Sequence, residues 1–233
     1  MEPQPGSAGS PNLRFAVPRL KALLYKELRM AVHPVFYLFP FFSALMFLPG
    51  YAATIGVSYA LLGVYGSFNM GRINKDLEFT ALLPVSRKSQ VFSKCFLAFF
   101  IEALHLAVFI PFAALYALHP GEDGPGIAPN SACAGFLLIA LGLFNLIFLP
   151  VFFKTGYKIG LPMFFGALGY GAALGILETA TALLPELKRV LDTFAPQALV
   201  FQLLALCAGL GFFAGTAWLS FRLSVKNFER VNL

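Results

Sequence analysis

Long uncharged stretches alternate along this chain with short clusters of charge. The first stretch runs from Pro34 to Gly71 without one charged side chain. Because an α-helix rises about 1.5 Å per residue and the hydrocarbon layer is about 30 Å thick, we expect this stretch to cross a membrane twice, turning at Pro49 and Gly50. Four further stretches, each long enough for one crossing, cover residues 95–118, 131–153, 159–182 and 198–221. The pattern predicts an all-α integral membrane protein with six transmembrane helices.

Basic residues fall almost entirely on one side of these six spans. Of the 17 lysines and arginines, 15 lie before span one, between spans two and three, between spans four and five or after span six. Only Lys188 and Arg189 lie on the other side. Because short loops rich in Lys and Arg stay in the cytoplasm, both termini are expected there. A five-span chain would break this partition, so we expect a 34–221 transmembrane domain and a cytoplasmic tail at 222–233.

Composition agrees with a membrane protein, and the absence of several motifs excludes some classes of function. Hydrophobic residues make up 58% of the chain, charged residues only 12%, and the mean hydropathy is +0.76. The sequence has no GxxxxGK[ST] loop, so any ATP-driven role requires a second polypeptide. The three cysteines and three histidines are scattered, and HExxH and GxSxG are absent. We therefore expect no metal site, no catalytic constellation, no cofactor in this chain and no nucleic-acid partner.

The N-terminal segment divides into two parts. Residues 1–13, rich in Pro, Gly and Ser, are expected to form a disordered tail. Residues 14–33 interleave leucines with charges, which predicts an amphipathic interfacial helix whose lysines face anionic lipid headgroups. An ordinary juxtamembrane linker is the alternative, because Pro18 interrupts the start. No signal peptide is expected, since the first strongly apolar run begins only after Val32.

The loop at 72–94 reads RINKDLEFTALLPVSRKSQVFSK and contains more apolar residues than a solvated loop needs. Pro84 should end one helix, and Ser86 is placed to cap a second helix that continues into span three. Two interpretations are open at this point. The loop either folds back on the bilayer or is covered by a partner.

The segment LLPVSRKSQVFSK, with KALLYKELRM ahead of the first span and Glu78 between them, resembles the LPvsRkxxVxsK signature of small bacterial ABC transporter permeases of the type-2 exporter superfamily. Within that superfamily the chain is most similar to the short six-helix permeases encoded beside separate ATPases, which include the phenol-soluble modulin exporter permease. The resemblance implies a bacterial cytoplasmic membrane as the location.

The resemblance also implies a working assembly. Residues 14–32 would match an elbow helix, 78–94 a coupling helix that docks on the ATPase, and 183–194 a short external re-entrant element. Two permeases would combine with two ATPase subunits, which would bind ATP and Mg. In the coupling helix the apolar residues would supply contact area with the ATPase, while Arg87 and Lys88 would orient the permease against it. The residues assigned to ATPase coupling are Glu78, Leu82, Leu83, Pro84, Val85, Ser86, Arg87 and Lys88.

Two further features lie inside the spans. Glu102 and His105 are three residues apart on one face of span three, where an unpaired carboxylate costs several kcal/mol. They are candidate translocation-pathway residues, with a structural hydrogen bond to a neighbouring helix as the alternative. Small residues recur at helical spacing in spans five and six, which indicates close packing within the subunit or with a second copy. These small residues are Ala167, Gly171, Gly175 and Thr179 in span five and Gly211 and Gly215 in span six.

The function predicted from these features is that of a permease subunit of an ATP-driven exporter, with amphipathic or hydrophobic substrates such as peptides. The expected partners are a separate ATPase, a second copy of the chain, the bilayer and the exported substrate. The alternative is an ATP-independent membrane transporter or membrane assembly factor. A membrane-embedded enzyme ranks third.

Overall fold

A computed structural model describes residues 21–76, 80, 85–119, 125–156 and 158–231. These residues are helices and short connections, without a strand among them, which confirms the all-α prediction. A helix at 21–26 leads into the short segments η1 (Glu27–Ala31), η2 (Pro34–Tyr37) and η3 (Phe39–Phe47). The elements that follow are α2 (Thr54–Ile73), α4 (Arg87–Leu118), α5 (Ser131–Lys154), α6 (Gly160–Leu183), α7 (Pro185–Leu191), η4 (Pro196–Ala198) and α8 (Leu199–Glu229).

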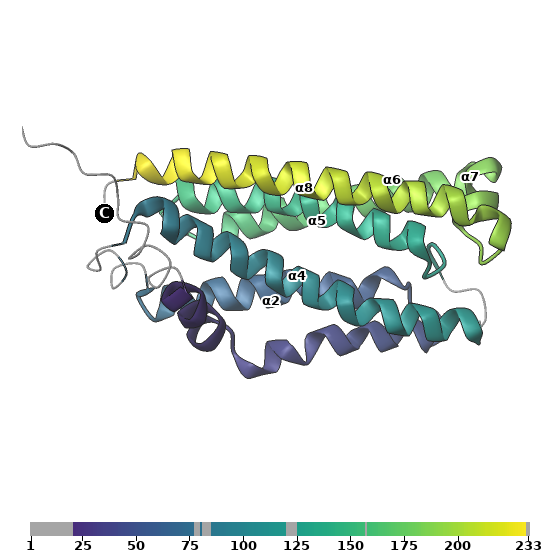
Figure 1. Ribbon diagram of the computed structural model, residues 1–233, viewed down its shortest axis with the longest axis horizontal. Helices are drawn as coiled ribbons and strands as arrows, with labels where there is room; N and C mark the ends of the chain where they lie inside the picture. The colour runs from purple at the N-terminus through teal and green to yellow at the C-terminus, as the bar shows by residue number, and fades with distance from the viewer. Residues whose placement is uncertain (1–20, 77–79, 81–84, 120–124, 157, 232–233) are drawn as a thin grey trace, which may run out of the picture.

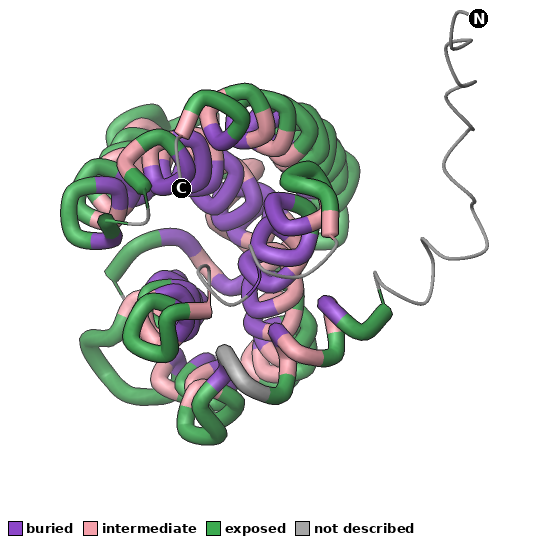
Figure 2. Tube along the Cα trace, turned by 90° about the vertical axis from the view of Figure 1, so that its left-hand side faces the viewer, coloured by how far each residue is buried: buried purple, intermediate pink, exposed green. Residues whose placement is uncertain are grey.

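The long helices form one elongated bundle made of two packed groups (Figure 1). In one group α5 packs against α8 and α6, and in the other α4 and α2 pack against η3. Contacts between α4 and α8 join the two groups. Viewed end-on, the buried positions line the inside of the bundle and the exposed positions its outside (Figure 2). This outer face is apolar, as expected for a surface that meets lipid.

Helix α5 is the most buried of the four long apolar helices. Its phenylalanines form the centre of the core, with Phe144, Phe148 and Phe152 stacked in sequence along the helix. Gly135 and Gly209 let α5 and α8 approach so closely that a Cβ on Gly209 would collide with the Gly135 backbone. Lipid provides no hydrophobic driving force between helices, so the van der Waals contacts made at this short distance stabilise the packing of α5 against α8.

The small residues predicted to pack inside the subunit point outward instead. Gly171 and Gly175 on α6 and Gly211 and Gly215 on α8 are exposed, and a Cβ on any of them would meet open space. The expectation of packing within the subunit is therefore wrong for these four positions, whereas packing against a second copy stays a prediction. Spacing alone identifies a smooth helix face but not the direction in which that face points.

Four helices, α4, α5, α6 and the segment Pro196–Glu229, are long and apolar enough to cross a membrane. A fifth span results if 21–29 and Pro34–Phe47, which meet at a 92° bend, are counted together. Pro34–Phe47 is largely 3₁₀-helical. A 3₁₀-helix rises about 2.0 Å per residue, so its 14 residues extend about 28 Å, against about 21 Å for an α-helix. This tighter winding gives a short segment nearly the length of a span.

Several local predictions are confirmed. The turn at Pro49 and Gly50 is present, with Gly50 at φ +83°, a conformation that L side chains rarely adopt. The Ser86 side chain accepts a hydrogen bond from the Ser89 amide and caps α4, which extends as a single helix to Leu118. The 1–13 tail and the start of the 14–33 helix lie outside the described residues.

Candidate functional site

A compact cluster of charges joins three separate segments at the end of the bundle where α4 begins. Lys94 of α4 donates to Glu27 at 2.6 Å and to Asp76, which follows α2, at 2.8 Å. Lys26 lies 2.5 Å from Asp76 and 3.4 Å from Glu27, and donates to the Thr80 hydroxyl at 3.1 Å. Two cations and two anions make the cluster electrically neutral. The cluster connects residues 21–29, which we call the N-terminal helix, to both ends of the 72–94 segment.

Burial strengthens the attraction between these charges relative to an ordinary surface ion pair. The Glu27 side chain is 1% exposed and that of Lys94 is 8% exposed. Partial burial opposes ionisation of Asp76, but the charges and hydrogen bonds of Lys94 and Lys26 outweigh it, so the pKa of Asp76 lies below its usual value. Gly71 of α2 leaves room for the amine, since a Cβ there would lie 3.1 Å from Lys94 Nζ.

The expectation that the lysines of the N-terminal segment face lipid headgroups is wrong for Lys26. Its amine turns toward Asp76, because a half-buried carboxylate at hydrogen-bonding distance attracts it more strongly than a hydrated lipid surface does. Lys21 is exposed, as an interfacial helix requires. The amphipathic pattern therefore locates the helix but assigns its charged face only in part.

The first turn of α4 contacts the end of α8. Arg87 Nη1 donates to the carbonyl oxygens of Phe228, Glu229 and Val231 at 2.9–3.2 Å. These acceptors are the carbonyls that a helix C-terminus leaves without partners, so Arg87 caps α8. Lys88 is exposed and makes no hydrogen bond or ion pair with any residue that the structure describes. The two predicted coupling cations thus have different surroundings.

The middle of α4 carries the second predicted pair. Glu102 and His105 are completely buried. Asn145 of α5 donates from Nδ2 to Glu102 Oε2 at 2.7 Å, and His105 Nδ1 lies 2.8 Å from the Ile101 carbonyl, to which it donates. Three neighbouring polar atoms have no hydrogen-bond partner among the described residues: Glu102 Oε1, Asn145 Oδ1 and His105 Nε2. The structural alternative for Glu102 therefore has a specific partner.

The structure places the predicted site residues in separate regions. Val85, Ser86, Arg87 and Lys88 lie at the start of α4, whereas Glu102 lies 15 residues further along, about 22 Å by helical rise. The remaining predicted coupling residues, Glu78, Leu82, Leu83 and Pro84, lie outside the described residues.

Sequence reasoning missed Asn145 and the pairing of the charge cluster. An amide in an otherwise apolar span was the available signal for Asn145, since polar side chains there need partners on other helices. The pairing within the cluster had no comparable signal in the sequence.

Comparison with protein families gives a match that covers most of the chain. The model of the family described as ABC-2 family transporter protein matches residues 22–229. This range begins in the N-terminal helix and ends at the last residue of α8, so it includes every element described above. Neither the curated proteins nor the solved structures give a match.

Proposed function

The chain belongs to the ABC-2 transporter family, and from this premise we propose that it is the permease subunit of an ATP-driven exporter. Family membership supports a membrane transport component that works with an ABC ATPase, and it disfavours the ATP-independent alternative. The finer parts of the proposal are export as the direction, a separate ATPase chain that binds ATP and Mg, and a second copy of the permease. Amphipathic or hydrophobic substrates such as peptides complete it.

We place the ATPase-facing surface at the end of the bundle that holds the charge cluster. This placement rests on one observation. Lys94 and Asp76 lie at the two ends of the 72–94 segment, and each forms an ion pair with a residue of the N-terminal helix. A partner that pushed on this segment would move α2, α4 and the N-terminal helix together. Such a connection is what a coupling helix needs in order to transmit force, and it supports assigning that role to 78–94.

The same arrangement supports an elbow helix and six spans. The N-terminal helix meets the following segment at 92°, which suits a helix that lies along the membrane surface before the chain turns into it. Helix α2 falls outside the set of strongly apolar helices, yet its 20 residues extend about 30 Å and it packs against α4 inside the bundle. We therefore count Pro34–Phe47 and α2 as spans one and two, with both termini cytoplasmic.

A pathway role for Glu102 and His105 is part of the proposal only under one condition. Both side chains are sealed inside one subunit, so they reach a substrate only if α4 separates from α2 or α5 during the cycle. In the conformation described here, the hydrogen bond to Asn145 supports a structural role.

The coupling surface is tested most directly through Lys88. Arg87 is unsuitable alone because its loss also uncaps α8, whereas Lys88 is exposed and makes no hydrogen bond or ion pair with the described residues. Lys88→Glu should weaken copurification with the ATPase, or lower ATP-dependent transport, without reducing the amount of chain in the membrane. Lys158→Glu is the matched control, an exposed lysine on the same side. Equal assembly and transport in both variants would refute the placement of this surface.

A further inference from the structure

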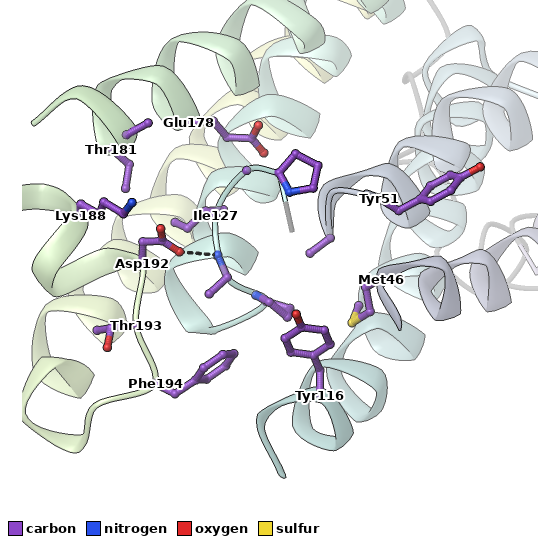
Figure 3. A pocket seen from close by; sticks show the side chains of 16 residues that line it. Met46, Tyr51, Tyr116, Ile127, Glu178, Thr181, Lys188, Asp192, Thr193 and Phe194 are labelled. Carbon is purple, nitrogen blue, oxygen red and sulfur yellow. Dashed lines mark hydrogen bonds between the residues drawn. The ribbon is translucent and has the colours of Figure 1, made fainter. Parts of the chain in front are cut away.

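A cavity of about 550 Å³ opens at the opposite end of the bundle from the charge cluster. Its walls come from residues 46–53, the end of α4, residues 125–129, the end of α6 and residues 188–194 (Figure 3). Small-molecule sites typically have volumes of about 300–1,000 Å³ and combine apolar walls with a few polar groups. Under the proposed orientation this cavity faces outward, away from the ATPase.

One wall of the cavity is aromatic. Tyr116 at the end of α4 and Phe194 after α7 lie with ring centroids 6.2 Å apart at an interplanar angle of 37°. Met46 lies beside Tyr116 in the close-up view (Figure 3). The faces of such rings attract organic cations as well as apolar groups.

The facing wall carries Glu178 of α6. Its Oε1 accepts a hydrogen bond from the Thr54 hydroxyl at 3.0 Å, which fixes the carboxylate in place. Its Oε2 has no hydrogen-bond partner within the part of the chain that the structure describes. Gly126 keeps this oxygen approachable: a Cβ there would lie 3.3 Å from Oε2, and the backbone at φ +89° excludes most other residues.

The remaining charged residues of the cavity determine the sign of its net charge. Asp192 Oδ1 accepts from the Ala128 amide at 2.8 Å and so holds the 125–129 segment against α7. Lys188 is the single cation among the described lining residues. Two carboxylates and one amine give this lining a net negative charge, which favours cations over anions.

We propose that this cavity binds a primary amine attached to an apolar body. The ammonium group pairs with Glu178, where an ion pair shielded from bulk water is stronger than at the surface, and the body lies against Tyr116 and Phe194. This inference goes beyond the proposed export function, because the cavity lies within one subunit and its occupation requires neither ATP nor an ATPase.

The test uses two fluorescent probes that share one fluorophore and linker and differ in the charge of the terminal nitrogen. Dansylcadaverine carries a primary ammonium, and its N-acetyl derivative is neutral with nearly the same apolar body. Both are titrated into purified full-length protein in neutral detergent, with protein-free micelles as the blank. We expect the amine to bind at least tenfold more tightly than its acetylated form. Equal affinities in the wild-type protein would overturn the proposal without any variant.

Glu178→Gln locates the site. The amide retains an acceptor for Thr54 but removes the charge, so the tenfold preference for the amine should disappear while the acetylated probe binds as before. Glu186→Gln on α7 is the matched control, an exposed carboxylate that is not part of the cavity lining, and it should keep the preference. A preference that persists in Glu178→Gln would refute the assignment. Copurification with the ATPase is scored separately, so failure of this site and failure of the proposed function are distinguishable.

Discussion

The hydrogen bond between Asn145 and Glu102 should contribute to stability in a way that a double substitution can measure. Both side chains are fully buried, and the donor–acceptor distance is 2.7 Å. Asn145→Leu leaves the Glu102 carboxyl without a partner among the described residues, because its other oxygen already lacks one. A buried polar group deprived of its partner costs about 1–3 kcal/mol.

Glu102→Leu should cost a similar amount, because it leaves the Asn145 amide unpaired. The double variant removes both polar groups together, so its loss should be much smaller than the sum of the two single losses. Interhelical hydrogen bonds in membranes average about 0.6 kcal/mol by this kind of cycle, which sets the lower end of the expected coupling. For a chain of this length, 1 kcal/mol corresponds to about 2–4 °C in Tm.

Thermal unfolding of the purified protein in one detergent, at one fixed scan rate, provides the measurement. Asn227→Leu is the control: Asn227 of α8 donates to the Pro150 carbonyl at 2.8 Å, but it is only half-buried near the end of the bundle. Its loss should be smaller, because water can replace the bond there. Losses for Glu102 and Asn145 that add without coupling would refute the reasoning.

The role of Glu102 in transport is decided by Glu102→Gln. The amide oxygen of Gln can accept from Asn145 as the carboxylate does, so fold and Tm should stay close to wild type. If Glu102 lines the pathway, transport should change despite this intact fold. Wild-type transport by Glu102→Gln, together with a destabilised Glu102→Leu variant, would leave only the structural role.

Three further outcomes follow from contacts at the two ends of the bundle. Lys94→Met should lower stability by about 3–5 kcal/mol, because it leaves Glu27 and Asp76 to share Lys26, so that one carboxylate charge of the cluster is uncompensated, and should speed tryptic cleavage near the N-terminal helix; unchanged cleavage would contradict the cluster's role. Asp76, whose pKa is lowered in the folded protein, should stabilise it above about pH 4 and lose this contribution as the pH falls through the lowered pKa, so wild type and Asp76→Asn should converge in Tm in acid. In intact cells, on a background without native cysteines, an impermeant thiol reagent should label Glu186→Cys but not Ser86→Cys, and the reverse would invert the proposed topology.

The sequence predicted elements more reliably than contacts. Long apolar runs, the Pro49–Gly50 turn and the Ser86 cap are local signals, because a few neighbouring residues determine them. The 3₁₀ winding of Pro34–Phe47 was not predicted. Its composition favours no particular helix type, although prolines such as Pro40 lack the amide that regular helical bonding uses.

The direction in which a helix face points required the structure. The spacing of Gly171 and Gly175 identified a smooth stripe on α6, but both residues lie on the exposed side. Likewise, the sequence analysis treated the basic residues of the 72–94 loop as equivalent positive charges. In the structure they differ, because Arg87 caps α8 and Lys94 belongs to a buried charge cluster. Pairing of this kind depends on contacts between segments up to 144 residues apart, which periodicity does not encode.

Helix α4 links the regions identified in this protein. Its 32 residues extend about 48 Å, well beyond the hydrocarbon thickness, from Arg87 past Lys94 and Glu102 to Tyr116 at the cavity. A packed helix transmits a displacement of one end to the other only while it stays rigid. Pro111 interrupts the hydrogen-bond ladder between Glu102 and Tyr116, which makes it the point where such a helix bends most easily. Motion that starts at the charge cluster therefore reaches Glu102 through an unbroken helix, whereas motion of the cavity wall depends on how α4 bends at Pro111.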